Sequence, residues 1–367
     1  MRNNPIPIDL AATARRRLGV STPMAILAVA LATAAGRLAR AAEVTSSASS
    51  ASPAGANATN DTVHWNTAFP WSDGAAPAAG NTYVIDGETV DTRSVSSTAA
   101  APQAFAGDGL RVTAGKLRLW RNHNSSTSTQ VFTAANFVLA GGTLESTAVT
   151  GTNQTTFASP VAVTAASTIG LAGGSFTNNL TFTGSLSGSG DLALTMTNSG
   201  TGRQITFAAA SPGYAGNWTM ASAATANKVV SAAAAGAMGA GAATVGNRIN
   251  LTNSVAGGLG TLASITLTGT GGLVLAAPLS AASMPVAMAT TTTVDLGAGA
   301  SAVGGLTIGT SAVAAGSYTA ADLAALGYGG TFAGAGTLTI VPEPASVGVG
   351  LVGLLLAGTR RRAVRRS

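Results

Sequence analysis

Few side chains in this 367-residue chain could take part in acid–base, nucleophilic or metal chemistry. The chain has no cysteine and two histidines, which excludes thiol nucleophiles and thiolate zinc sites. His64 lies in an aromatic segment and His123 in a polar run, where a solvated or capping role is expected. The sequence offers no nucleophile with a partner base and no carboxylate pair suited to glycoside hydrolysis. We therefore expect no catalytic residue, no cofactor and no enzymatic activity.

The closest group of acidic residues is Asp86, Glu88 and Asp91, and its carboxylates could bind calcium. The pair Asp86-Gly87 is typical of a two-residue hairpin turn, and strand alternation would place Glu88 on the exposed side of that hairpin. A solvated turn is therefore the preferred interpretation, with a calcium site as the alternative.

Threonines in Thr-x-Thr pairs form a second pattern. Side chains alternate along a strand, so each pair places two hydroxyls on one face, as in ice-binding solenoids. The pairs begin at Thr181, Thr195, Thr266 and Thr337, and these starting positions do not follow one constant repeat period. The ordinary preference of threonine for strands explains these pairs, and a water-ordering surface is the alternative.

The net charge of +6 belongs to the ends of the chain. Eleven of the 19 Lys and Arg residues lie before residue 43 or after residue 341. Between Glu43 and Val341 there are 8 basic and 11 acidic residues, and the basic ones are scattered. A duplex-binding protein needs clustered cations to neutralise phosphates, so we expect no nucleic-acid partner.

The N-terminal segment, 1–42, has the three parts of an export signal. Cations at Arg15–Arg17 precede an apolar run, 24–35, and a small-x-small triplet follows it. As a helix the apolar run is about 18 Å long, too short for a hydrocarbon core of about 30 Å. We therefore expect a signal peptide over residues 1–42 and the export translocon as a partner, by either the Sec or the twin-arginine route. The cleavage region comprises Ala39, Ala41 and Ala42.

The C-terminal segment, 342–367, combines a proline motif, an apolar run and an arginine cluster. Pro342 and Pro344 fix φ and favour an extended backbone around Glu343, which presents this motif to a recognising enzyme. The uncharged run 345–359 can enter a bilayer as a short transmembrane helix of about 22 Å. The positive-inside tendency would keep the arginine cluster on the cytoplasmic side. The cluster comprises Arg360, Arg361, Arg362, Arg365 and Arg366.

This order of motif, apolar run and arginine cluster resembles the PEP-CTERM sorting signal of Gram-negative bacteria. The resemblance covers residues 342–367 and implies that an exosortase-type membrane protease recognises Pro342, Glu343 and Pro344. It further implies transient membrane anchoring, removal of the tail, and delivery to the cell surface or the extracellular space, often in bacteria that make exopolysaccharide. A C-terminal anchor that is never cleaved is the alternative.

The exported region between these two ends is rich in small residues. The whole chain has 46% hydrophobic residues, 5% aromatic residues and 47 glycines, and such small side chains suit thin layers better than a bulky core. Residues 43–60 are mostly Ser, Ala, Asn and Thr, and we expect a disordered linker there. From Trp65 onward, aromatic residues and turn signals gather, which indicates the N-terminal cap of a folded region, 61–341.

Short segments with period-two alternation, each followed by Gly, Asn or Ser, recur through this region and predict strands. Many strands of three to five residues favour an all-β fold, a parallel β-helix or β-solenoid whose coils pair with the coils on either side. A β-sandwich is the alternative. Helix signals are few: residues 320–326 could form one turn, and the glycine-containing segment 231–243 predicts an irregular coil. The alternating tripeptides start at Leu117, Phe137, Leu180, Leu192, Ile205, Ile265, Leu273, Val294, Leu306 and Leu338.

Two glycine-rich segments, 186–192 and 214–218, look like the autotransporter-associated β-strand repeat. In that repeat a glycine-rich turn leads into a strand, and a Tyr-x-Gly element precedes another strand. The resemblance covers a short part of the folded region and supports the solenoid. The segments 316–323 and 334–340 also look like the closing part often found before this sorting tail, so the folded region is expected to end near Val341.

These patterns predict an exported structural protein of the cell surface or extracellular matrix, with exopolysaccharide as a candidate contact. The alternative is a carbohydrate- or ice-binding β-helix that uses exposed Thr, Asn and aromatic groups. A carbohydrate-active enzyme is the third possibility, and polysaccharide lyases also use β-helices. The stretch from Leu251 to Val341 has neither Lys nor Arg, which argues against lyase chemistry there.

Overall fold

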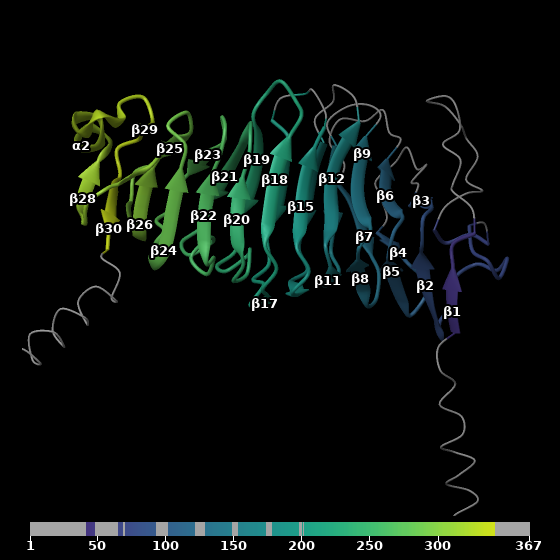
Figure 1. Ribbon diagram of the computed structural model, residues 1–367. Helices are drawn as coiled ribbons and strands as arrows, with labels where there is room; N and C mark the ends of the chain where they lie inside the picture. The colour runs from purple at the N-terminus through teal and green to yellow at the C-terminus, as the bar shows by residue number, and fades with distance from the viewer. Residues whose placement is uncertain are drawn as a thin grey trace, which may run out of the picture. The chain divides into compact units, whose positions relative to one another are not determined.

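The chain forms a parallel β-solenoid, as the alternation predicts, and not a β-sandwich (Figure 1). The computed structural model describes residues 42–47, 65–68, 70–92, 102–121, 129–148, 153–173, 178–197, 200 and 202–341. Each of the alternating tripeptides overlaps a strand. Leu117 and Leu119 are fully buried while Lys116 and Arg118 face outward between them, which is the pattern of a strand with one wet face.

Three sheets form the walls of the solenoid, and we number them in the order in which the chain visits them within a coil. The first sheet has the strand order β1 (Ala42–Thr45), β2 (Asn81–Ile85), β5 (Gly109–Val112), β8 (Phe137–Ala140), β11 (Val161–Ala165), β14 (Leu186–Gly188) and β17 (Gly213–Tyr214).

The second sheet begins at β3 (Thr89–Asp91) and continues with β6 (Lys116–Arg121), β9 (Thr143–Ala148), β12 (Ser167–Gly173), β15 (Leu192–Met196), β18 (Trp218–Ser222), β20 (Ala242–Val245), β22 (Ser264–Leu267), β24 (Ser280–Met288), β26 (Ala300–Ile308), β30 (Thr337–Ile340) and β28 (Gly316–Thr319), with β27 (Ser311–Ala312) beside β26. The third sheet has the order β4 (Gln103–Ala104), β7 (Thr129–Thr133), β10 (Asn153–Phe157), β13 (Asn178–Phe182), β16 (Gln204–Phe207), β19 (Lys228–Ala232), β21 (Ile249–Asn253), β23 (Gly272–Val274), β25 (Thr293–Asp295) and β29 (Phe332–Ala333).

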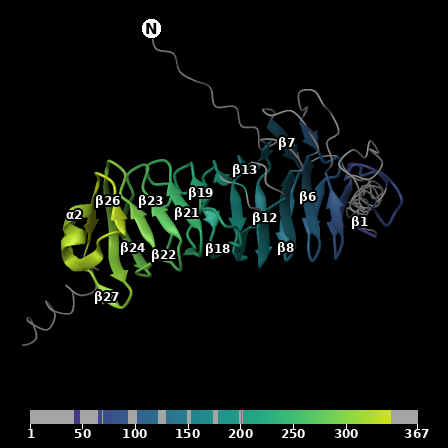
Figure 2. The same ribbon diagram turned by 90° about the horizontal axis from the view of Figure 1, so that it is seen from above.

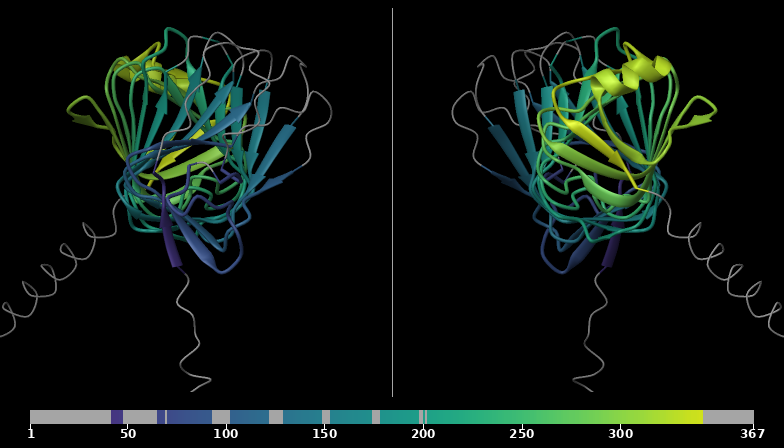
Figure 3. Two further views of the ribbon diagram at one scale, coloured as in Figure 1. Left: turned by 90° about the vertical axis from the view of Figure 1, so that its right-hand side faces the viewer. Right: turned by 90° about the vertical axis from the view of Figure 1, so that its left-hand side faces the viewer.

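The coils shorten along the chain, and Figure 2 shows them in succession from β6 to β26. In the second sheet Val90 pairs with Leu117, whereas Met288 pairs with Ile308, which is a clearly smaller step along the sequence. The shortening follows the loss of one wall, because the first sheet ends at β17 and later coils contribute strands to the second and third sheets. End-on views show the walls around a common core (Figure 3).

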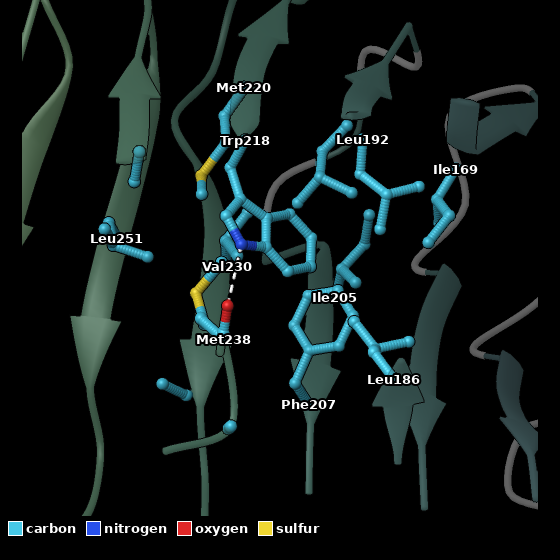
Figure 4. Close-up of a cluster of buried hydrophobic side chains, with 14 of the residues drawn as sticks. Ile169, Leu186, Leu192, Ile205, Phe207, Trp218, Met220, Val230, Met238 and Leu251 are labelled. Carbon is cyan, nitrogen blue, oxygen red and sulfur yellow. Dashed lines mark hydrogen bonds between the residues drawn. The ribbon is translucent and has the colours of Figure 1, made fainter. Parts of the chain in front are cut away.

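Stacked aromatic and aliphatic side chains fill this core. Phe157, Phe182 and Phe207 occupy the same position on successive coils of the third sheet, and the rings of Phe182 and Phe207 are stacked with centroids 5.2 Å apart. Trp218 packs against Phe207, and its indole nitrogen donates to the carbonyl of Met238 at 2.9 Å (Figure 4). Each coil therefore buries a narrow stack, as the few bulky residues of the sequence predict.

Both ends of the solenoid are closed, which confirms the predicted N-terminal cap. At the first coil Trp65, Trp71, Tyr83 and Phe105 form one aromatic cluster with centroid distances from 4.9 to 6.0 Å. At the last coil, β28 pairs antiparallel with β30 and leads into α2 (Ala320–Leu323) and η1 (Ala324–Tyr328). The side chain of Thr319 caps α2, so the single predicted helical turn is present.

Two local predictions were wrong. Asp86-Gly87 is not a hairpin turn, because β2 and β3 belong to different sheets and pair in parallel with β5 and β6. The disordered linker expected over 43–60 begins too early, since Val44 is buried in β1 and the N–H of Ser46 donates to the carbonyl of Val84 at 2.7 Å. Residues 48–60 lie outside the described residues, as does the C-terminal helix expected over 345–359. Among the described residues, no helix has the length and the apolar character that a membrane span requires.

Candidate functional site

The acidic group singled out in the sequence is divided between a corner and the second sheet. Asp91 is buried, and its two carboxylate oxygens accept from Nε and Nη2 of Arg118, each at 2.7 Å. Asp86 lies at the corner and accepts from the hydroxyl of Thr113 at 3.0 Å. Asp91 is therefore committed to an ion pair, and the described residues contain no cluster of three His, Asp or Glu suited to a metal ion.

Most residues of the expected signal peptide, 1–42, and of the expected sorting segment, 342–367, lie outside the described part of the chain. Ala42 is the first residue of β1, while Ala39 and Ala41 are not described. Pro342, Glu343 and Pro344, which the sequence predicts to form a sorting motif, are likewise outside, as are the C-terminal arginine cluster, His64 and His123. The last strand, β30, ends at Ile340, two residues before Pro342.

The four Thr-x-Thr pairs do not lie in one array. Thr181 belongs to the third sheet, and the pairs that start at Thr195, Thr266 and Thr337 belong to three separate strands of the second sheet. The parallel strands of the third sheet bring other polar residues together, and the Thr-x-Thr pattern in the sequence did not reveal them.

A ladder of amide and hydroxyl side chains runs across three adjacent coils on the outer face of the third sheet. On β10, β13 and β16 the amides Gln154, Asn179 and Gln204 occupy one outward position. The register pairs Gln154 with Asn179, and the backbone N–H of Gln204 donates to Oδ1 of Asn179 at 3.0 Å. The outward position two residues later holds three threonines, which pair in register: Thr156, Thr181 and Thr206.

We call these six side chains the amide–threonine ladder. The inward residues between and beside them are buried, including Leu180, Ile205 and the three phenylalanines of the core stack. Gln154 is exposed and the other five side chains are half-buried, so all six reach the surface. The buried stack fixes the register, because a slip of one residue would place the amides and threonines in the core.

The threonine hydroxyls of the ladder are available to a ligand. In the described part of the chain, no hydrogen bond involves the hydroxyl of Thr156, Thr181 or Thr206. The side-chain hydrogen bonds of their strands are made by neighbouring residues, such as Thr155 and Asn179. The amides are partly engaged: Gln154 Oε1 accepts from the hydroxyl of Thr129 at 3.4 Å, and Asn179 Oδ1 accepts from Gln204 as stated above. The ladder therefore combines free hydroxyls with amides, two of which, Gln154 and Asn179, are held by hydrogen bonds to the neighbouring coils.

The ladder is bounded along the solenoid axis. Toward the N-terminus its threonine position is taken by Val131, and toward the C-terminus its amide position is taken by Val229. At the threonine position of β19, Ser231 is buried and its hydroxyl lies 2.6 Å from that of Ser254. The polar face thus spans three coils, about 10 Å between the outer two at about 4.8 Å per coil.

No charged side chain reaches the surface within the ladder. The cations Arg203 and Lys228 precede the outward residues of β16 and β19, but they are 1% and 0% exposed. Burial lowers the pKa of both groups, and the charge of Arg203 lowers the pKa of Lys228 further. These cations lie inside the coils and present no donor to a ligand on the outer face.

The second sheet carries a longer but simpler row of threonines. Its outward position holds threonine on most coils from β9 to β26, with alanine at Ala193 and Ala287. Among the described residues a single amide, Asn217, lies two residues before a threonine of this row, and its Oδ1 accepts from the N–H of Ala242 at 3.1 Å, so the row lacks the amide on successive coils that the ladder has. The threonine row of the second sheet comprises Thr143, Thr168, Thr219, Thr244, Thr266 and Thr307.

A shallow hollow of about 380 Å³ lies where the first sheet ends. Small residues line it, among them Ala210, Pro212 and Gly257, together with Thr261 and Ser280. The hydroxyl of Thr261 already donates to the carbonyl of Gly239 at 2.7 Å. The hollow is a consequence of replacing a strand by tight turns, and it brings no set of polar groups together.

One signal in the sequence could have revealed the ladder. The pattern amide-x-Thr-Phe occurs at Gln154, Asn179 and Gln204, with the same spacing between successive copies. The distance in sequence between successive copies equals the distance in sequence between paired residues of adjacent coils, so the copies lie side by side in the third sheet. Amide and hydroxyl groups exchange hydrogen bonds with a polar ligand and supply neither a nucleophile nor a strong base. Comparisons of the chain with protein-family models, with curated proteins and with solved structures gave no match.

Proposed function

We propose that this protein is an exported structural component of the cell surface or the extracellular matrix, sorted through Pro342, Glu343 and Pro344 by an exosortase-type protease. The observation that carries the proposal is positional. All described strands lie between Ala42 and Ile340, and the proline motif begins two residues after the last of them. In the sequence the motif therefore follows directly on the C-terminal cap, where a sorting signal read after the folded region would be expected.

The start of the solenoid supports the export half of the proposal. The signal cleavage region ends where β1 begins, at Ala42, so cleavage after Ala41 leaves the edge strand of the first sheet complete. Val44 and Ser46 then dock on the first coil, and the mature chain starts as part of the fold.

The chemistry of the described surface supports a structural role over an enzymatic one. Among the described residues the charged pairs Lys116–Glu145 and Arg118–Asp91 are engaged with each other. The one ordered array of mixed polar groups described above, the amide–threonine ladder, holds groups that bind rather than react. A rigid, capped solenoid with such a surface suits a scaffold in a polysaccharide matrix.

The routing claim is tested in a host that makes the exosortase-type protease. The double variant Pro342→Ala, Glu343→Ala should leave the protein in the membrane fraction with its tail attached, because the motif is no longer read. The matched control is Pro285→Ala, an exposed proline of β24 far from the motif in sequence. Release of the double variant at the rate of the control would overturn the proposal.

A further inference from the structure

We infer that the amide–threonine ladder binds a neutral polysaccharide strand that lies along the solenoid axis, across β10, β13 and β16. The inference deepens and rests on the proposed function, since it names the matrix component that an exported scaffold would hold.

The ladder matches the hydrogen-bonding chemistry of sugar hydroxyls. A hydroxyl both donates and accepts, and an amide offers two donors and one acceptor, so each coil presents both kinds of partner. The free hydroxyls of Thr156, Thr181 and Thr206 repeat at the coil spacing of about 4.8 Å. An extended glycan has hydroxyls at a similar repeat along its length and can therefore contact successive coils in the same way.

Charge favours a neutral chain over an acidic one. The only acidic residue between Glu145 and Asp295 is Asp191, and its carboxylate accepts from the N–H of Asn217 at the corner between the first and second sheets. Arg203 and Lys228 are buried, so neither can pair at the ladder surface with a uronate or a sulfate. Recognition of an acidic chain would need such a pair at the surface.

Size and regularity favour a single strand over a second protein molecule or ice. The three short strands of the ladder cover roughly 200 Å², whereas a stable protein interface buries about 800 Å² on each partner. The alternation of Gln and Asn gives the amide row uneven side-chain lengths, which a flat ice lattice would not match. A polysaccharide adapts to uneven contacts through its own torsions.

The experiment measures retardation of the full chain, purified in mild detergent, in native gels. Separate gels contain hydroxyethylcellulose, galactomannan, dextran or alginate. We expect retardation by at least one of the three neutral polymers, whereas retardation by alginate comes from the arginines at the two ends of the chain and should be the same in every variant. The triple variant Thr156→Val, Thr181→Val, Thr206→Val should weaken the apparent affinity at least tenfold, because three hydrogen-bonding hydroxyls are lost while strand preference is kept.

The matched control is the triple variant Thr168→Val, Thr219→Val, Thr244→Val, which makes the same change in the threonine row of the second sheet. It should bind like the unmodified chain, and circular dichroism should show equal strand content for both triple variants. Three results would overturn the inference: no retardation by any neutral polymer, retardation by alginate that the first triple variant abolishes, or equal weakening by both triple variants. Ice shaping or self-association lost only in the first triple variant would likewise assign the ladder to another ligand.

The outcome is independent of the routing experiment. Binding is measured on purified protein and does not require that the sorting motif be read. If the protein binds a neutral polymer but the Pro342→Ala, Glu343→Ala variant is still released, the ladder inference stands and the sorting proposal is wrong. If the protein binds no neutral polymer but the double variant stays in the membrane fraction, the sorting proposal stands and the ladder inference is wrong.

Discussion

Arg203 and Lys228 lie one above the other on adjacent coils, and both are buried. The N–H of Val229 donates to the carbonyl of Arg203 at 3.0 Å, so the two cations occupy equivalent positions where β16 and β19 begin. The ammonium group of Lys228 donates to the carbonyl of Gly200. The one carboxylate in this part of the sequence, Asp191, lies at another corner, so this hydrogen bond rather than an ion pair holds the ammonium. Burying a charge in this way is costly, which makes this place a weak point of the fold.

We therefore expect the free energy of unfolding to rise with pH below about pH 10. The pKa of Lys228 is lowered by burial and by Arg203, so the folded chain loses this proton at a lower pH than the unfolded chain, whose lysine has a pKa near 10.5. Between those two pKa values the unfolded state binds more protons, and stability increases as pH rises. Thermal unfolding at half-unit steps from about pH 7 to pH 9.5 measures this slope.

The variant Lys228→Met is the control for the origin of that slope. It removes the buried ammonium and keeps an unbranched apolar chain, so it should raise the melting temperature at pH 7 by a few degrees and flatten the pH dependence. Lys116→Met, which removes a surface partner of Glu145, should leave the slope in place. The range stops below pH 10 because burial and Asp191 raise the pKa of Tyr214 above its usual value of 10, and stability is lost as pH rises beyond that. An unchanged slope in Lys228→Met would contradict the assignment.

Gly216 lies where two coils approach closely, and we expect Gly216→Ala to destabilise the solenoid strongly. A Cβ atom there would overlap the carbonyl oxygen of Gly190 and lie 2.6 Å from the hydroxyl of Tyr214. That hydroxyl donates to the same carbonyl at 2.9 Å, so the added methyl would also displace a buried hydrogen bond. Relief of the overlap requires the coils to separate, at a cost of about 2 kcal/mol or more.

Gly305→Ala is the matched control for this substitution. Gly305 also lies on the solenoid wall, but an added Cβ would meet no atom within 4 Å. Denaturant unfolding should therefore show a loss for Gly216→Ala and a change within about 0.5 kcal/mol for Gly305→Ala. Equal midpoints for the two variants would mean that the corner is looser than the described contacts indicate.

The solenoid itself was predictable from the sequence, because alternation and turn residues act locally. The stretch around Leu117 and Leu119 shows this, since leucines and charged residues alternate as a half-buried strand requires. The aromatic cap was predictable for the same reason: Trp65, Trp71 and Tyr83 gather in a segment with few other bulky residues.

The sequence did not show which strands pair with each other, or in which register. Asp86-Gly87 has the residues of a hairpin turn, yet it forms a corner between β2 and β3, which belong to different sheets. A hairpin turn and this corner both need a glycine in the left-handed region, and Gly87 has φ 79°, so the residue types alone do not distinguish them. The loss of the first sheet after Tyr214 is a matter of coil length, which local patterns do not encode. The ladder depends on the register between coils. The Thr-x-Thr pattern did not predict it, because Thr181 lies beside Thr156 and Thr206 of the adjacent coils and not in a row with Thr183.

Phe182 is the middle ring of the core stack that holds the ladder in register, and we expect Phe182→Ala to cost about 3–5 kcal/mol. The side chain is fully buried between Phe157 and Phe207, with centroids 6.0 and 5.2 Å away, so its removal leaves a cavity that the neighbouring coils cannot fill. The control is Leu326→Ala in η1, where the side chain is 54% exposed and the loss should stay below about 0.5 kcal/mol. Guanidinium unfolding followed by circular dichroism compares the two midpoints. Because each coil is stabilised mainly by its neighbours, the Phe182 variant should also broaden the transition as the middle coils unfold first. A sharp transition at the midpoint of the control would show that the stack contributes less than its burial implies.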